Sequence, residues 1–406
     1  MKINEERLWR HIQELGQIGR SADGSVTRFP FTKEDEAAAE LLKGWMQEAG
    51  LCVRVDACGN IIGTIPGKNE KLAPVICGSH FDTVKEGGIF DGCLGVLAGI
   101  EVLQTIQEAG IQPKRPLKVI GFRDEEGNRF GYGMIGSRSV CGNVDAAGLQ
   151  SEDHDGITLA QAMLEAGYHP QRYISCRIAP LAAYYELHIE QADVLYAHDC
   201  PVGIVEGIAG LVRYTVTISG RSAHAGATPM QRRHDPVTAM ARWISQITQL
   251  ASQYPHTVAT IGEIHTLPGA CNIICDHVRF SLDLRSLDDL VIVRLLDAMQ
   301  EFEKQLEKEQ GVQVQRRLEQ KLNASLCDES LKQELKQCCE QLGLQTMQLA
   351  SGAGHDCMNF RNICPTAMIF VRSQHEGASH CREEYSTKED CRDGCQLLLE
   401  ALRKYL

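Results

Sequence analysis

The feature that most constrains the fold is a set of short apolar runs, each of which ends abruptly in charged or polar residues. Runs of this length suit strands that are buried on both faces, as in parallel sheets covered by helices. Polar side chains gathered where such strands end are typical of an α/β active site. The runs and the residues that follow them are 73–78 before His80 and Asp82, 117–122 before Glu125 and Glu126, and 182–187 before His188.

Helix signals lie between these apolar runs. Thr32 and Asp35 form a capping box at the start of an Ala- and Leu-rich stretch that runs to Gly50. Residues 51–65 are expected to form a hairpin, and residues 94–109 a helix. Strands that alternate with helices predict an α/β domain.

The order of elements changes between residues 210 and 318. The expected order is a strand at 211–218, a helix at 235–254, strands at 257–264 and 278–284, a helix at 287–310 and a strand at 312–317. This βαββαβ order is that of a ferredoxin-like domain. A strand at 365–371 and a helix from 388 then resume the first pattern. We therefore expect a catalytic domain made of residues 1–209 and 323–406, with residues 210–322 inserted between its two parts.

Composition excludes several classes of function. The chain of 406 residues has a formal charge of −12 and no long basic tract, which argues against a nucleic-acid partner. No stretch reaches about 18 apolar residues, so no membrane span is expected. The N-terminus has amphipathic-helix spacing and not the apolar core of a signal peptide. The 17 scattered cysteines are therefore expected to be reduced thiols in a cytoplasmic protein.

Five residues at these strand ends and in loops are candidate metal ligands: His80, Asp91, Glu126, His188 and His380. Imidazole and carboxylate ligands suit zinc, manganese, cobalt or nickel, and one carboxylate that bridges two ions allows them to share a water molecule. Each residue alone is weak evidence, because a single His is more often structural and Asp91-Gly92 resembles an ordinary turn. In the adjacent pair Glu125-Glu126, one carboxylate can bind metal while the other faces the water as a general base. The alternative for this pair is a solvated acidic loop.

The sequence contexts of these residues add a resemblance. They read Gly-Ser-His80-Phe-Asp82-Thr-Val, Gly-Gly-Ile-Phe-Asp91-Gly, Asp-Glu125-Glu126-Gly-Asn-Arg-Phe, Glu-Leu-His188-Ile-Glu-Gln191 and Ser-His380. Together with Ala-Gly-Ala-Thr-Pro-Met after His224, they resemble the aminoacylase and carboxypeptidase clan of di-metal hydrolases. Within it, the chain looks like the branch with N-carbamoyl-L-amino-acid hydrolase, allantoate amidohydrolase and β-ureidopropionase of the yeast type. One departure is that Arg382 stands where these relatives usually carry Pro.

The resemblance implies a role for each matching residue. It implies that His80 and Glu126 bind separate ions, that Asp91 bridges them, and that His188 and His380 complete the two sets of ligands. Asp82 would orient His80, and Glu125 would be the general base. In these relatives the inserted domain is a lid that also mediates dimerisation. His224, as the oxyanion donor, would then enter the active site of the partner subunit of a homodimer, together with Asn272 and Arg285.

Residues for the substrate follow from the same resemblance. Gln191 and the turn that contains Gly352, Ala353 and His355 would line the pocket. Arg285 alternates with the apolar residues of its strand, so it lies on the opposite face and can bind a carboxylate in a bidentate manner. An ion pair between Arg285 and Asp283 is the alternative interpretation of the same spacing.

The function implied is metal-dependent hydrolysis of the carbamoyl C–N bond of an N-carbamoyl-L-amino acid, which releases ammonia, CO2 and the amino acid. Allantoate amidohydrolase activity is the first alternative, and an aminoacylase or dipeptidase is the second. A metal-binding scaffold without catalysis is disfavoured because the candidate base Glu125 is present. A nucleotide-dependent oxidoreductase is disfavoured because the glycines at 92, 95 and 99 lack the GxGxxG spacing.

Overall fold

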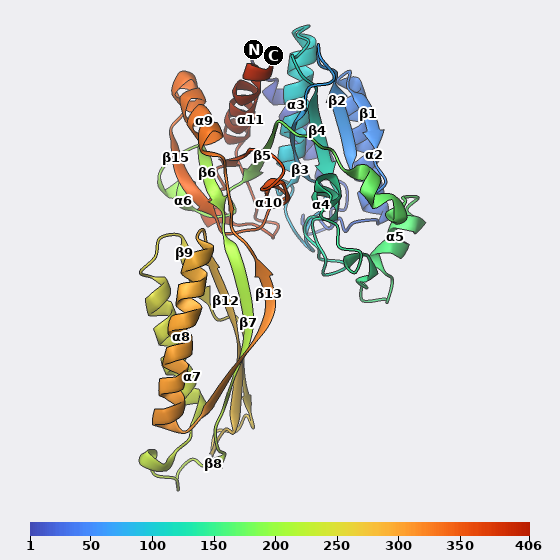
Figure 1. The fold of residues 1–406 in the computed structure, drawn as a ribbon. Helices are drawn as coiled ribbons and strands as arrows, with labels where there is room; N and C mark the ends of the chain where they lie inside the picture. The colour runs from blue at the N-terminus through green and yellow to red at the C-terminus, as the bar shows by residue number, and fades with distance from the viewer. The chain divides into compact units, whose positions relative to one another are not determined.

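The computed structural model describes residues 1–406 and divides the chain into two compact units (Figure 1). The first unit is made of Met1–Glu206 and Cys327–Leu406, and the second is Gly207–Leu326. These boundaries lie within four residues of the expected ones. None of the helices combines the length and the apolar character needed to cross a membrane.

A nine-stranded mixed sheet has the order β1-β2-β4-β3-β5-β16-β6-β14, with β15 paired to β6, and organises the first unit. Its last strand, β14, pairs with Gly207 and Ile208 of β6, and these residues are counted with the second unit. Its centre is parallel, because β3 pairs in parallel with β4 and β5, and β5 with β16. The strands are β1 (Cys52–Val55), β2 (Ile61–Ile65), β3 (Val75–His80), β4 (Leu117–Phe122), β5 (Ala183–Ile189), β6 (Val202–Ile208), β14 (Ser325–Leu326), β15 (Thr346–Ser351) and β16 (Thr366–Val371).

Helices cover both faces of this sheet, as the apolar runs predicted (Figure 1). On one face, α3 packs on β3, β4 and β5, and the large apolar core lies there with Tyr185 and Leu187. On the other face, Tyr184 stacks on Phe360 of α10. The helices are α1 (Glu5–Leu15), α2 (Lys33–Glu48), α3 (Cys93–Glu108), α4 (Ile135–Cys141), α5 (Leu159–Glu165), α6 (Val194–Ala197), α9 (Glu329–Leu342), α10 (Cys357–Phe360) and α11 (Lys388–Leu402).

The parallel pairing determines where the functional side chains lie. His80, at the end of β3, stands opposite Phe122, at the end of β4, and His188 of β5 stands opposite Phe370 of β16. The carboxyl ends of parallel strands meet at one edge of a sheet, so the polar segments that follow β3 and β4 come together with the end of β5.

The second unit has the βαββαβ order that the sequence predicted. Helices α7 and α8 pack together with the sheet β10-β12-β7-β13 around one apolar core (Figure 1). Asp235 caps α7 and is followed by Pro236 at its first position. The elements are β7 (Gly210–Ser219), β8 (Ala223–His224), α7 (Pro236–Ala251), β9 (Thr257–Thr260), β10 (Ile264–Leu267), β11 (Ile273–Ile274), β12 (His277–Ser286), α8 (Asp289–Gln310) and β13 (Gln313–Leu322).

One predicted strand is wrong. Residues 257–264 were expected to form a single strand, but β9 ends at Thr260 and β10 begins at Ile264, and both pair with β12. The backbone N–H groups of Gly262 and Glu263 donate to the Ser281 hydroxyl, not to a strand partner. These hydrogen bonds to a side chain replace the backbone pairing with β12 at Gly262 and Glu263, and so divide the expected strand in two.

Candidate active site

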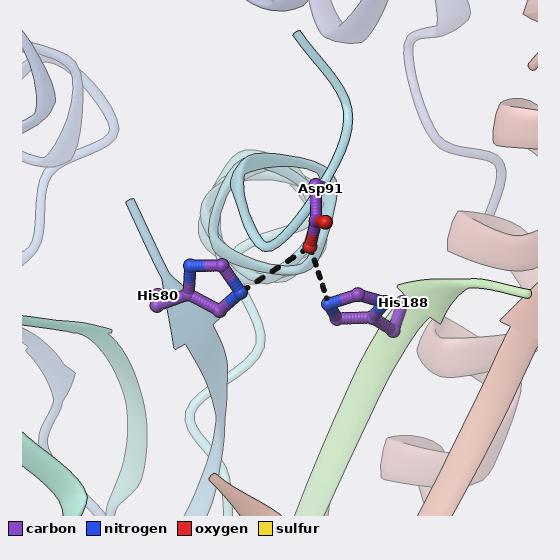
Figure 2. Close-up of side chains that lie close together, drawn as sticks. All are labelled: His80, Asp91 and His188. Carbon is purple, nitrogen blue, oxygen red and sulfur yellow. Dashed lines mark ion pairs between the residues drawn. The ribbon is translucent and has the colours of Figure 1, made fainter. Parts of the chain in front are cut away.

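The first unit gathers imidazoles and carboxylates at the carboxyl edge of its parallel strands. Figure 2 shows His80 from β3 and His188 from β5, which both point toward Asp91 in the loop before α3. The Asp91 Oδ1 atom lies 3.4 Å from His80 Nε2 and 3.1 Å from His188 Nε2. All three side chains are buried. Three such donors within 4.8 Å of one another can hold one metal ion.

A second group of ligands shares the same carboxylate. The other oxygen of Asp91, Oδ2, lies 3.2 Å from His380 Nε2, and that nitrogen lies 3.7 Å from Glu126 Oε1. The structure therefore brings all five predicted ligands together, in two groups that share Asp91, and a third group of possible ligands, His80 with Glu125 and Glu126, overlaps both. Glu125 stands beside the first group, with Oε2 at 4.0 Å from His80 Nε2. Imidazoles and carboxylates that converge in this way fit divalent metal ions.

Asp82 positions the acidic pair. Its two carboxylate oxygens accept the backbone N–H groups of Glu125, at 3.1 Å, and Glu126, at 3.2 Å. Its Oδ1 atom also lies 3.6 Å from His80 Nδ1. Asp82 thus links the segment that carries both glutamates to the imidazole of the first group. The sequence had placed Asp82 beside His80 but had not foreseen its hydrogen bonds to the acidic pair.

Three of the non-glycine residues with positive φ angles lie at the cluster. Asp124, Gln191 and His380 have φ angles of 53°, 59° and 56°, which side chains other than glycine rarely adopt. Such angles persist at sites where the surrounding structure fixes them, and they are enriched at functional sites.

Proximity shifts the protonation of the cluster. Although burial disfavours its charge, hydrogen bonds from the three imidazoles lower the pKa of Asp91 well below its usual value. Burial and the charge of Asp91 raise the pKa of Glu126 to about 7. Burial, opposed by His80 and reinforced by Glu126, raises the pKa of Glu125 well above its usual value. The hydrogen bond to Asp91 raises the pKa of His380 to about 9. Protons on the imidazoles and carboxylates thus offset part of the negative charge of the cluster, at positions that divalent cations would also suit.

Gln191 reaches the second group of ligands. Its Nε2 atom donates to Asp91 Oδ2 at 2.8 Å and to the Ser379 hydroxyl at 3.2 Å, while its Oε1 atom is buried without a hydrogen-bond partner. This amide oxygen is an acceptor within the cluster.

The turn after β15 also comes close to the cluster. The His355 ring lies 4.4 Å from the His188 ring, and its Nε2 atom lies 2.8 Å from the Ser351 hydroxyl. Burial, reinforced by the charge of His188, lowers the pKa of His355 well below its usual value, so this imidazole is neutral. Gly352 and Ala353 form the turn between Ser351 and His355.

Residues 76–404 match the pattern of peptidase family M20/M25/M40. The chain belongs to this family.

The M20 chain is similar over its whole length to several named proteins. It is 46% identical to an N-carbamoyl-L-amino acid amidohydrolase of Geobacillus stearothermophilus, over 98% of this chain and 97% of the relative. It is 33% identical to an allantoate amidohydrolase of Bacillus subtilis, over 97% and 96%. Among solved structures, a hydantoinase/carbamoylase family amidase from Burkholderia multivorans superposes with a TM-score of 0.93 at 32% identity, over 100% and 98%.

The remaining predicted residues of this M20 chain lie in the second unit. His224 belongs to β8, which pairs with β11, and the backbone N–H of Ala225 donates to the carbonyl of Asn272. His224 and Asn272 therefore share one small exposed structure. Arg285 in β12 contacts Asp283 through Nε at 2.7 Å and Nη2 at 3.0 Å, which is the ion pair considered as its alternative. Arg213 of β7 also binds Asp283, at 2.8 Å.

Glu384 also lies at the cluster and was not predicted from the sequence. Its Oε1 atom accepts the backbone N–H groups of Phe90, at 2.9 Å, and Asp91, at 3.0 Å, and its Oε2 atom accepts the Ser379 hydroxyl at 3.0 Å. Glu384 is 5% exposed. Its neighbours Arg382 and Glu383 are charged and exposed, so the local sequence looks like a solvated loop and gives no signal of this burial.

Proposed function

We propose that this protein is a metal-dependent amidohydrolase that cleaves the carbamoyl C–N bond of an N-carbamoyl-L-amino acid. The observation that carries the proposal is the pair of ligand groups that share Asp91, with Glu125 beside them. A bridging carboxylate and an adjacent glutamate are the parts that hydrolysis at a dinuclear centre requires. The similarity to amidohydrolases named for carbamoyl amino acids supports the choice of substrate.

Two divalent ions, zinc, manganese, cobalt or nickel, would be held by these residues. His80 and His188 would bind one ion, Glu126 and His380 the other, and Asp91 would bridge them. When bound, such ions polarise a substrate carbonyl and lower the pKa of a water molecule. Cellular supply decides among metals that the same ligands accept.

Glu125 is proposed to move the proton. As a carboxylate it takes a proton from the attacking water, and as a carboxylic acid it returns that proton to the nitrogen that leaves. Its burial, which disfavours the charged form, makes it a stronger base than an exposed glutamate. One water is consumed, and ammonia, CO2 and the amino acid are formed, because the carbamate left by the first cleavage loses CO2 without catalysis.

His224 is proposed to stabilise the oxyanion of the tetrahedral intermediate. Its Nδ1 atom accepts the backbone N–H groups of Gly226 and Ala227, both at 3.1 Å. In the neutral imidazole the proton must therefore be on Nε2, which becomes a fixed donor on an exposed side chain. A donor aimed at the developing negative charge contributes most of its energy in the transition state.

Arg285, with Asn272, is proposed to bind the substrate carboxylate. Asp283 accepts from both Arg285 and Arg213. The two guanidinium groups and the carboxylates of Asp283 and Glu263 all line a cavity of about 630 Å³ in the second unit, so a substrate carboxylate that binds there would compete with these carboxylates for Arg285. A planar guanidinium that is already aligned by one carboxylate loses little entropy when it binds another.

The second unit is proposed to serve as a lid and dimerisation domain that gives His224 to the active site of a partner subunit. Inactive Glu125→Ala and inactive His224→Ala proteins should then complement after mixing. A mixed two-fold dimer has one site with both changes and one with neither. Random exchange makes half of the dimers mixed, so activity should recover to roughly a quarter of wild type. Activity that stays at background, although tagged subunits have exchanged, would show that His224 does not act in the partner.

A substrate panel tests the proposed reaction. Ammonia should appear with N-carbamoyl-L-amino acids when manganese or zinc is present, and chelation should abolish its release. Allantoate is the second candidate, since an allantoate amidohydrolase matches nearly the whole chain. An N-acyl-amino acid and a dipeptide complete the panel. Turnover of these two substrates alone, without ammonia, would replace the proposal by an aminoacylase or dipeptidase.

The 17 cysteines are free, which supports a reducing, cytoplasmic location.

A further inference from the structure

We propose that Glu384 is a positioning residue that sets how strongly Asp91 binds metal. It acts on Asp91 in two ways, through the backbone of the loop that carries it and through the Ser379 hydroxyl. The inference rests on the proposed function in one respect, which is that Asp91 is the carboxylate shared by two ions.

The first action holds the loop before α3. Glu384 Oε1 accepts the N–H groups of both Phe90 and Asp91, so one oxygen fixes two successive peptide groups. The loop packs directly on this carboxylate, because a Cβ added at Gly88 would lie 2.2 Å from Oε1. The backbone of Asp91 therefore has a fixed position, and its side chain reaches His80 and His380 from there.

The second action directs a single proton. The Ser379 hydroxyl lies 3.0 Å from Glu384 Oε2 and 3.4 Å from Asp91 Oδ2, and it has one hydrogen to donate. The closer carboxylate oxygen, that of Glu384, takes this hydrogen, while the hydroxyl oxygen accepts from Gln191 Nε2. Asp91 Oδ2 already accepts from Gln191 Nε2 at 2.8 Å and is therefore spared a second hydrogen bond, which would compete with a metal ion for its remaining lone pair.

The variant Glu384→Gln separates the two actions. The two backbone N–H donors require the amide oxygen to face Phe90 and Asp91, so the loop keeps its hydrogen bonds. The amide NH2 group then faces Ser379 and donates to it, which turns the hydroxyl hydrogen toward Asp91. We expect zinc affinity to fall by about 10- to 100-fold, the usual effect of altered partners around metal ligands.

Removal of the hydroxyl should reverse this loss. In the double variant E384Q/S379A no hydroxyl remains to donate to Asp91, so zinc affinity should recover most of the way toward that of S379A alone. A purely structural role for Glu384 predicts the opposite, because two defects in one loop would add.

Glu101→Gln is the matched control, since Glu101 is also buried and also accepts a backbone N–H, that of Asn4 at 2.7 Å. Zinc affinity of the control should equal that of wild type.

A second pair of variants covers the case in which Glu384→Gln does not fold. Gly88→Ala displaces the Glu384 carboxylate without changing any charge, whereas a Cβ at Gly87 meets only Val84 Cγ2, at 2.9 Å, and backbone atoms beyond 3.4 Å. Gly88→Ala should therefore weaken zinc binding by about 10-fold or more relative to Gly87→Ala.

The measurement is competition for zinc against a chromophoric chelator, with thermal unfolding of the metal-free proteins alongside. Equal affinity of Glu384→Gln and wild type, or a double variant as weak as Glu384→Gln, would overturn the proposal, as would equal affinity of the two glycine variants. Failure of the wild-type protein to bind two zinc ions would instead refute the proposed function.

Discussion

Gly92 offers a sharp test of the first metal position, because its missing side chain leaves space for the His80 ring. A Cβ added there would lie 2.3 Å from His80 Cε1 and 2.4 Å from both ring nitrogens. Ordinary carbon contacts are about 3.5 Å, so the ring must move by about 1.2 Å. Metal–ligand distances tolerate about 0.2 Å, which is roughly a sixth of that displacement. Gly92→Ala should therefore lose zinc affinity by at least about 100-fold.

The stability of the same variant can be estimated and controlled. Gly92 has a φ of 63°, and an L-residue in this left-handed region costs about 1–2 kcal/mol. Overlap with the ring adds about 1–3 kcal/mol, so urea unfolding should show a total loss of about 2–5 kcal/mol. Gly110 is the matched control, since its φ is 65° and a Cβ there would meet nothing within 4 Å. Gly110→Ala should cost only the backbone term and bind zinc normally. Wild-type zinc affinity in Gly92→Ala would refute His80 as a ligand.

Two further predictions concern pH. The pKa of Glu126 is raised to about 7 and that of His380 to about 9, and both must lose a proton to bind metal. Zinc affinity should therefore rise with pH up to about 9 and be accompanied by proton release in calorimetry; a flat profile would contradict this assignment. The His11 ring stacks on Trp45, and burial lowers its pKa to about 4. Its contribution to stability is complete above about pH 6.5 and is lost as pH falls toward 4, by at most roughly 3 kcal/mol. Urea unfolding of wild type and His11→Phe should therefore diverge below pH 6.5, and a constant difference would be inconsistent with a buried neutral imidazole.

The parts of the site that lie at strand ends were accessible to sequence reasoning. His80, Glu126 and His188 follow or end apolar runs, and the parallel order of β3, β4 and β5 necessarily brings the ends of these runs together. The βαββαβ order could also be predicted, because the hydrophobic residues of strands and helices have clearly different periods along residues 210–322. The split between β9 and β10 could not be predicted, since it depends on a hydrogen bond from the backbone N–H of Gly262 to the Ser281 hydroxyl.

Residues on loops required more than periodicity. Asp91 and His380 were singled out by their resemblance to known motifs, and their meeting depends on contacts between segments 289 residues apart. Glu384 escaped notice because burial of a carboxylate in a polar loop is decided by the loop that packs on it. For Arg285, alternation along β12 places Asp283 on the same face, so the sequence allowed both an ion pair and a substrate contact.

The central claim is that Glu125 moves protons while its neighbour Glu126 holds metal. It is tested most directly by measuring metal content and turnover together in Glu125→Gln and Glu126→Gln. We predict that Glu125→Gln keeps about two ions per chain and loses turnover by roughly 10²–10⁴. Glu126→Gln should lose one ion, because His380 and Asp91 alone would remain at that position. If Glu125→Gln lost the ion, and Glu126→Gln kept both ions but not turnover, the assigned roles would be reversed. If both variants turned over substrate at the wild-type rate, the account would be contradicted.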